Sequence, residues 1–128
     1  MENTNGTNPK PTILIIGPPG DLQIGLQALL NSHLDIDVLA TSGWTSAFKA
    51  LSIYLPDLVI LDNDHTLKKG LDIGQEIKTN WPDIPLIIFV TDDQNKLAYS
   101  DQDVELIVKK GYPGSELIND IRYLLDLN

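Results

Sequence analysis

The sequence predicts a single α/β domain of the (βα)5 type, a doubly wound sheet of five parallel strands with helices on both faces. The chain has 128 residues, close to the usual size of one domain. Short, continuous apolar runs alternate along it with segments of helical periodicity. Such runs are typical of strands covered on both faces, and their alternation with helices indicates a parallel sheet.

The predicted strands are five short apolar runs of ordinary strand length. They comprise residues 12–17, 36–40, 58–62, 86–91 and 104–109. The preceding segment, residues 1–11, is polar, rich in Asn and Thr, and closed by prolines, a composition that cannot form a core. We therefore expect a flexible N-terminal tail over residues 1–11 and one domain over residues 12–128.

The segments between and after the strands are predicted helices, at residues 21–32, 45–55, 70–80, 93–101 and 115–127. Leucines recur at helical spacing in the first, and Asp21 is suited to cap its start. Pro56 ends the second, because the residue before a proline is pushed out of the helical conformation. Since crossovers between parallel strands are right-handed, this order implies an open sheet with helices on both faces.

Composition limits the functions available to the chain. It has no cysteine, which excludes disulfides, zinc–thiolate sites and thiol nucleophiles and fits a reducing compartment. The formal charge of −9 at pH 7 repels phosphate backbones and anionic lipid surfaces. The longest apolar runs are far too short to span a membrane. We therefore expect a cytoplasmic protein that binds neither nucleic acid nor membranes.

The predicted fold places the functional site at the carboxyl ends of the strands. In open parallel sheets the working cleft lies outside those ends, where the strand order reverses. The residues found there are Gly17 after the first strand, Asp62 after the third, Thr91 after the fourth and Lys109 after the fifth. A carboxylate, a hydroxyl and an ammonium are thus expected at one edge of the sheet.

These strand-end residues carry a resemblance to a known family. The segment PDLVILD, residues 56–62, is very similar to the third strand of response-regulator receiver domains, and Gly70 falls at the spacing where they place a glycine after the loop. LIIFVT, residues 86–91, and ELIVKK, residues 105–110, resemble their fourth and fifth strands. The match covers almost everything after residue 11. It implies the flavodoxin-like fold of receiver domains and a non-enzymatic role in two-component phosphorelay signalling.

The resemblance also implies roles for the strand-end residues. Asp62 is the candidate phospho-acceptor, because a carboxylate can attack phosphorus and hold the phosphoryl group as an acyl phosphate. Thr91 and Lys109 would donate to the phosphoryl oxygens, and Lys109 is expected to pair with Asp62 even without phosphate. The implied partners are a histidine kinase or phosphotransfer protein, a downstream protein, and a second copy bound at the face of the fourth helix, fifth strand and fifth helix.

The metal site that the resemblance implies is degenerate. Receiver domains follow the first strand with an acidic pair that helps to hold Mg²⁺, whereas Gly17 and Pro18 stand here. Mg²⁺ usually needs one or two protein carboxylates in an octahedral set of oxygens. The sequence offers Asp62, with Asp21 and Asp64 as substitute ligands, although capping a helix is the competing role of Asp21.

Two further departures leave an alternative open. Lys109 is followed by Lys110 and Gly111, where the family has a proline and an aromatic residue, and Asp92 adds a negative charge next to Thr91. Like charges a few ångströms apart cost on the order of 1 to 4 kcal/mol. The first hypothesis is a phosphorylated receiver with Asp62 as acceptor. The alternative is a pseudo-receiver, a protein-interaction module that keeps the fold and works without phosphorylation.

Overall fold

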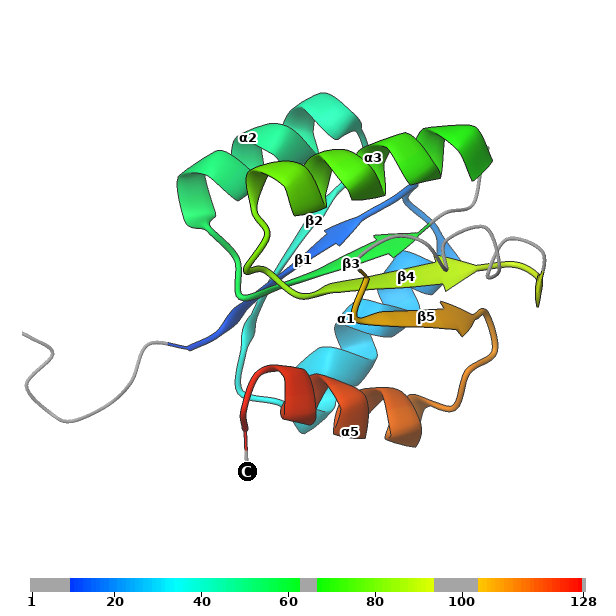
Figure 1. The fold of residues 1–128 in the computed structure, drawn as a ribbon. Coiled ribbons are helices and arrows are strands. Elements are labelled where there is room, and N and C mark those ends of the chain that lie inside the picture. Colours follow the sequence, from blue (N-terminus) through cyan, green and yellow to red (C-terminus); the bar gives the residue numbers. More distant parts are fainter. Residues whose placement is uncertain (1–9, 63–66, 94–103, 128) are drawn as a thin grey trace, which may run out of the picture.

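The five strands form one parallel sheet in the order β2-β1-β3-β4-β5 (Figure 1). The computed structural model describes residues 10–62, 67–93 and 104–127. The strands are β1 (Thr12–Ile16), β2 (Asp37–Thr41), β3 (Leu58–Asp62), β4 (Leu86–Val90) and β5 (Leu106–Lys109). The chain moves outward from β1 to β2 and then returns to the other side of β1 at β3. The strand order therefore reverses at the carboxyl ends of β1 and β3.

Two helices cover each face of this sheet within the described residues. They are α1 (Asp21–His33), α2 (Trp44–Tyr54), α3 (Leu67–Asn80) and α5 (Gly114–Leu124). Figure 1 shows α1 and α5 on one face and α2 and α3 on the other. The predicted fourth helix, residues 93–101, lies outside the described residues except for Asp93. None of the helices in the described ranges is long and apolar enough to cross a membrane.

Alternate strand residues point into two separate cores. On β1, Ile13 and Ile15 pack with α1 and α5, while Leu14 and Ile16 pack with α2 and α3. The central strands β3 and β4 are buried along their whole length. This is why they read as continuous apolar runs in the sequence. The carboxylate that ends β3 is consequently held at the end of a rigid, fully packed element.

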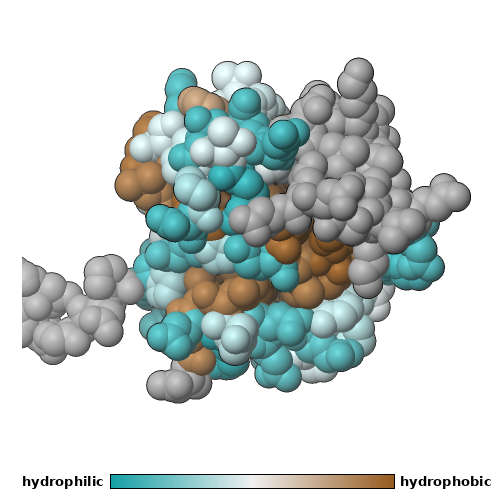
Figure 2. Space-filling view, in the orientation of Figure 1, coloured by the Kyte–Doolittle hydropathy of each residue, from teal (hydrophilic) through white to brown (hydrophobic). Residues whose placement is uncertain are grey.

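Aromatic side chains join α2 to the segment after α3. The ring of Phe48 meets Trp44 and Trp81 edge to face, with ring centroids 5.7 and 5.3 Å apart. Most of the large apolar side chains that the described residues expose lie on α2 or directly after it, at Phe48, Ile53, Tyr54 and Leu55. Figure 2 shows apolar surface over the C-terminal end of α2. The helix that covers one core thus presents apolar side chains to solvent as well.

The predicted strands are confirmed, with shifts of one or two residues at their ends. Gly17 and Thr91 lie just beyond β1 and β4, and β5 begins at Leu106, two residues later than predicted. The prediction that Asp21 caps α1 is wrong: Gly20 is the N-cap, and no side chain caps that end. Asp21 lies instead in the first turn, where a negative charge favours the helix dipole.

The ends of the helices follow from local packing. Leu55 adopts the left-handed conformation (φ 47°) before Pro56, so α2 stops one residue earlier than predicted. The predicted helix 115–127 stops at Leu124, because Asp126 also turns left-handed (φ 57°) and lets Leu127 pack on the α1–α5 core. Of the predicted tail, residues 1–9 lie outside the described residues. The carbonyl of Pro11 accepts a hydrogen bond from the Asp37 amide (2.9 Å).

Candidate functional site

Asp62 lies at the carboxyl end of β3, beside the point where the strand order reverses. Its side chain is 6% exposed, and it is the buried charged residue of the described core. A buried carboxylate is tolerated only where a positive charge or hydrogen-bond donors compensate it. The buried carboxylate of Asp62 therefore needs a positively charged or hydrogen-bonding partner.

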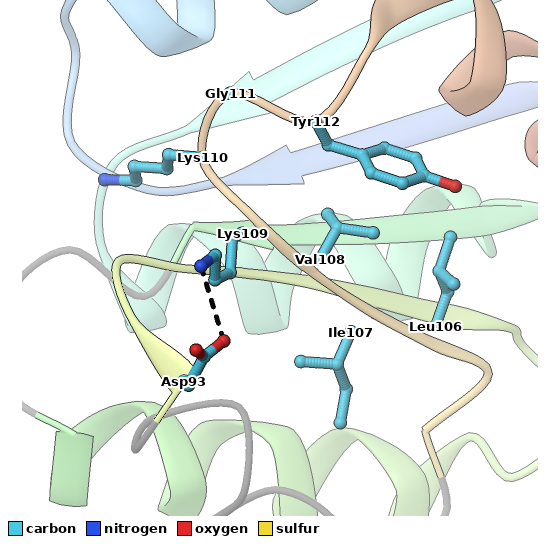
Figure 3. Close-up of a pocket in the computed structure, with 8 residues that line it drawn as sticks. All are labelled: Asp93, Leu106, Ile107, Val108, Lys109, Lys110, Gly111 and Tyr112. Carbon is cyan, nitrogen blue, oxygen red and sulfur yellow. Dashed lines mark ion pairs between the residues drawn. The ribbon is translucent and has the colours of Figure 1, made fainter.

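That partner is Lys110, and the prediction that Lys109 pairs with Asp62 is wrong. Lys110 Nζ lies 3.1 Å from Asp62 Oδ1, whereas Lys109 Nζ lies 3.4 Å from Asp93 Oδ1. Figure 3 shows the two lysine side chains leaving the chain in different directions. Side chains alternate along β5, so Lys109 projects on the side opposite to the buried Val108. Lys110, one residue beyond the strand, reaches the end of β3.

The sequence contained a signal for this choice. The residues after Lys110 are Gly111 and Tyr112, so an aromatic residue stands two positions after it, as it does after the lysine of receiver domains. Gly111 has φ 97°, a left-handed conformation that glycine adopts readily and that proline, with φ fixed near −65°, cannot. The departure from the family at this turn is thus the replacement of proline by glycine, and the aromatic residue is kept.

Tyr112 fastens this turn to α5, a role that the sequence did not predict. Its hydroxyl donates a hydrogen bond to Asp120 Oδ2 at 2.6 Å. That bond, together with burial and the negative charges of Asp120 and Glu116, raises the pKa of Tyr112 to about 12. The chain from β5 to α5 is therefore held on both sides of Gly111, by the Lys110–Asp62 contact and by the Tyr112–Asp120 hydrogen bond.

A hollow of about 460 Å³ lies beside β5, lined by Asp93 and residues 106–112 (Figure 3).

Gly17 packs directly against Asp62. A Cβ atom built on Gly17 would lie 2.6 Å from Asp62 Cβ and 3.4 Å from its Cγ and Oδ2. The Gly17 amide also donates to the carbonyl of Thr41 at 3.0 Å, which holds the turn close to the sheet. Only glycine fits this approach, since real side chains do not come so near. The position where receiver domains carry an acidic residue thus has no room for a side chain.

The described residues do not fit a Mg²⁺ site. They contain no group of three or more side chains of the metal-binding types. Asp21 is exposed in the first turn of α1, and Asp64 lies outside the described residues. Asp62 already faces an ammonium group at 3.1 Å. Mg²⁺ requires several oxygen ligands at short, nearly octahedral positions, and the part of the chain that is described forms no such group.

The hydroxyl residue predicted for the site follows β4 at the same edge of the sheet. Thr91 and its neighbours Asp92 and Asp93 are exposed. The amide of Lys110 donates to the carbonyl of Val90 at 2.9 Å, so the lysine leaves β5 beside the end of β4. The structure thus brings Asp62 and Lys110 into contact and places Thr91 after the strand that neighbours β3.

Comparison with known proteins identifies the fold. No model of a known protein family matches the sequence, and no curated protein matches it. Solved structures do match. The signal receiver domain of an HD domain-containing protein from Pseudomonas fluorescens Pf-5 is 21% identical, with a TM-score of 0.80 over 92% of this chain and 96% of that one.

Two other structures show the same likeness. The N-terminal signal receiver domain of a two-component system response regulator from Bacteroides fragilis is 24% identical (TM-score 0.80, 91% of this chain and 98% of that one). The signal receiver domain of a signal transduction histidine kinase from Syntrophus aciditrophicus is 19% identical (TM-score 0.76, 91% and 90%). The predicted single-domain (βα)5 sheet is confirmed, and its fold is that of signal receiver domains.

Proposed function

We propose that this chain is a receiver-type module of two-component signal transduction, which acts through contacts with protein partners rather than as an enzyme. One observation carries the proposal: a buried carboxylate at the carboxyl end of β3, Asp62, lies 3.1 Å from an ammonium group at the end of β5. Asp62 ends β3, beside the reversal of strand order between β1 and β3, and this supports the proposal because open sheets have their functional sites there. The proposed place of action is the cytoplasm, in keeping with a chain without cysteine.

In this proposal Asp62 is the phospho-acceptor. A carboxylate oxygen attacks the phosphorus of a phosphohistidine on a histidine kinase or phosphotransfer protein. The phosphorus–nitrogen bond breaks, the imidazole leaves and takes up a proton, and an acyl phosphate forms on Asp62. Lys110, which already contacts Asp62, takes the role first assigned to Lys109 and donates to the phosphoryl oxygens. Thr91 is proposed as the hydroxyl donor.

The phosphorylation-independent pseudo-receiver is the second candidate, and the packing of Gly17 favours it. The turn after β1 brings no carboxylate to Asp62 and fills the space beside it. A phosphoryl group adds about −1.5 to −2 charge at pH 7, whereas the Lys110 ammonium that contacts Asp62 carries a single positive charge. In this form the Asp62–Lys110 pair is a fixed part of the fold, and the output depends on a constitutive surface.

The proposed partners are the phosphoryl donor, a downstream protein and a second copy of the chain. For the second copy we propose the surface of β5 and α5. A groove of about 160 Å³ lies there between Leu106 and Leu124, and Tyr123 is 84% exposed. The fourth helix of the predicted face lies mostly outside the described residues. Sedimentation of the protein beside a Tyr123→Ser variant tests this surface, because a dimer formed there dissociates more readily in the variant.

The experiment that separates the two forms is treatment with acetyl phosphate and Mg²⁺, followed by intact mass and amide spectra. One added phosphoryl group on the wild-type chain, and none on an Asp62→Asn control, establishes Asp62 as the acceptor. An adduct that persists in the control overturns that assignment. No adduct, together with unchanged amide spectra, supports the pseudo-receiver.

A further inference from the structure

The charge of Asp62 is balanced within the protein. The carboxylate is 6% exposed and the Lys110 side chain 27% exposed, and their charged atoms lie 3.1 Å apart. Burial makes an uncompensated carboxylate costly, and an ammonium group in contact with it offsets part of that cost. The pair is formally neutral as it stands. A divalent cation balances the negative charge of a group of carboxylates. At Asp62 the Lys110 ammonium already supplies a balancing positive charge.

The described residues that pack beside Asp62 after β1 also bring no oxygen ligand for a divalent cation. The turn after β1 reads Gly17, Pro18, Pro19 and Gly20, so none of its side chains carries an oxygen. A side chain at residue 17 would collide with Asp62 Cβ at 2.6 Å. An acidic residue thus cannot be restored at this position while Asp62 stays where it is.

We infer that Lys110 takes the place of a divalent cation at Asp62, so that the resting state of this module is independent of Mg²⁺. The inference rests on the proposed function because it takes Asp62 as the central residue of the site. It applies to both forms of that function, the phosphorylated receiver and the pseudo-receiver. The ammonium is covalently part of the β5–α5 turn, which Tyr112 ties to α5 through its 2.6 Å hydrogen bond. The position of this turn is therefore set by the protein itself and not by the concentration of the ion.

The first test needs no variant. The ¹⁵N-labelled protein is titrated with Mg²⁺ into the millimolar range, and separately with paramagnetic Mn²⁺, without any phosphoryl donor. We expect no saturable shift or selective broadening at the amides of Gly17, Asp62 and Lys110, and an unfolding midpoint that does not change with Mg²⁺. Saturable changes at these amides that disappear in Asp62→Asn would overturn the inference.

The second test replaces each of the two adjacent lysines in a separate variant, so that one serves as the control for the other. Lys110→Met leaves Asp62 without its ammonium, so we expect a lower unfolding midpoint that Mg²⁺ does not restore, because the described residues form no group of ligands for the ion. Lys109→Met removes the exposed pair with Asp93 and should keep the wild-type midpoint and remain indifferent to Mg²⁺. Lys110→Arg keeps the charge and is expected to behave like the wild type. Equal midpoints for Lys110→Met and Lys109→Met would contradict the inference.

The outcomes separate this inference from the proposed function. Binding of Mg²⁺ at Asp62 overturns the inference even if Asp62 is phosphorylated. Absence of both Mg²⁺ binding and a phosphoryl adduct keeps the inference and leaves the pseudo-receiver as the function. An adduct on Asp62 that forms equally well with a chelator present supports both the inference and the acceptor role.

Discussion

The contact between Gly17 and Asp62 predicts that adding a single methyl group destabilises the protein. In Gly17→Ala the new Cβ lies 2.6 Å from Asp62 Cβ, almost an ångström short of the 3.4 Å at which ordinary contact begins. The two backbones cannot easily separate, because Ile16 and Leu61 just before them are paired in register on β1 and β3. Overpacking of this kind costs about 1 to 3 kcal/mol of unfolding free energy.

A second glycine supplies the matched control. Gly25 lies on the exposed side of α1, and a Cβ there meets nothing within 4 Å. Alanine is preferred to glycine inside a helix by about 1 kcal/mol, so Gly25→Ala should raise the unfolding free energy. Urea unfolding followed by circular dichroism measures both variants. If Gly17→Ala equals the wild type in stability and leaves the amide signal of Asp62 unchanged, the space between Gly17 and Asp62 admits a side chain and the steric argument fails.

Two other predictions concern polar contacts away from Asp62. Tyr112→Phe loses the hydrogen bond to Asp120 and should cost about 1 kcal/mol near neutral pH. Because folding raises the pKa of Tyr112 from 10.0 to about 12, this contribution is complete below pH 10 and is lost as the pH rises through 12. The unfolding free energies of the wild type and the variant, measured by urea melts, should therefore converge over this range. A constant difference between them would refute the assignment. Lys78→Met removes an 8% exposed ammonium that pairs with Glu105 at 3.2 Å and donates to the Ile84 carbonyl at 3.0 Å. We expect thermal and urea unfolding to show a loss of about 2 to 3 kcal/mol, and a loss below about 0.5 kcal/mol would show that the pair contributes little.

The receiver fold leaves the output of the module open, since similar domains occur in proteins of different kinds. The solved structures include receiver domains from an HD domain-containing protein, a response regulator and a histidine kinase. At the strand ends of this chain, Gly17 packs on Asp62, and Lys110 contacts the carboxylate. Experiments on function should therefore begin with Asp62 and with the β5–α5 turn that Lys110 joins to it.

The sequence alone determined the sheet and placed the candidate site residues at the ends of its strands. Strands buried on both faces must be apolar throughout, so β3 and β4 were visible as continuous runs. Asp62 was identifiable because a carboxylate follows such a run directly, and parallel strands end at a common edge. These inferences need only the periodicity of side chains and the rules of strand connection.

Only the tertiary structure decided which side chains meet at that edge. The aromatic residue two positions after Lys110 is a signal in the sequence, but adjacent residues at a strand end point in different directions. The contact with Asp62 was therefore decided by the point where β5 ends and the turn at Gly111 begins. The space at Gly17 depends on the distance between two strands that are remote in sequence. Direction and distance across strands are properties of packing, and no periodicity in a single chain encodes them.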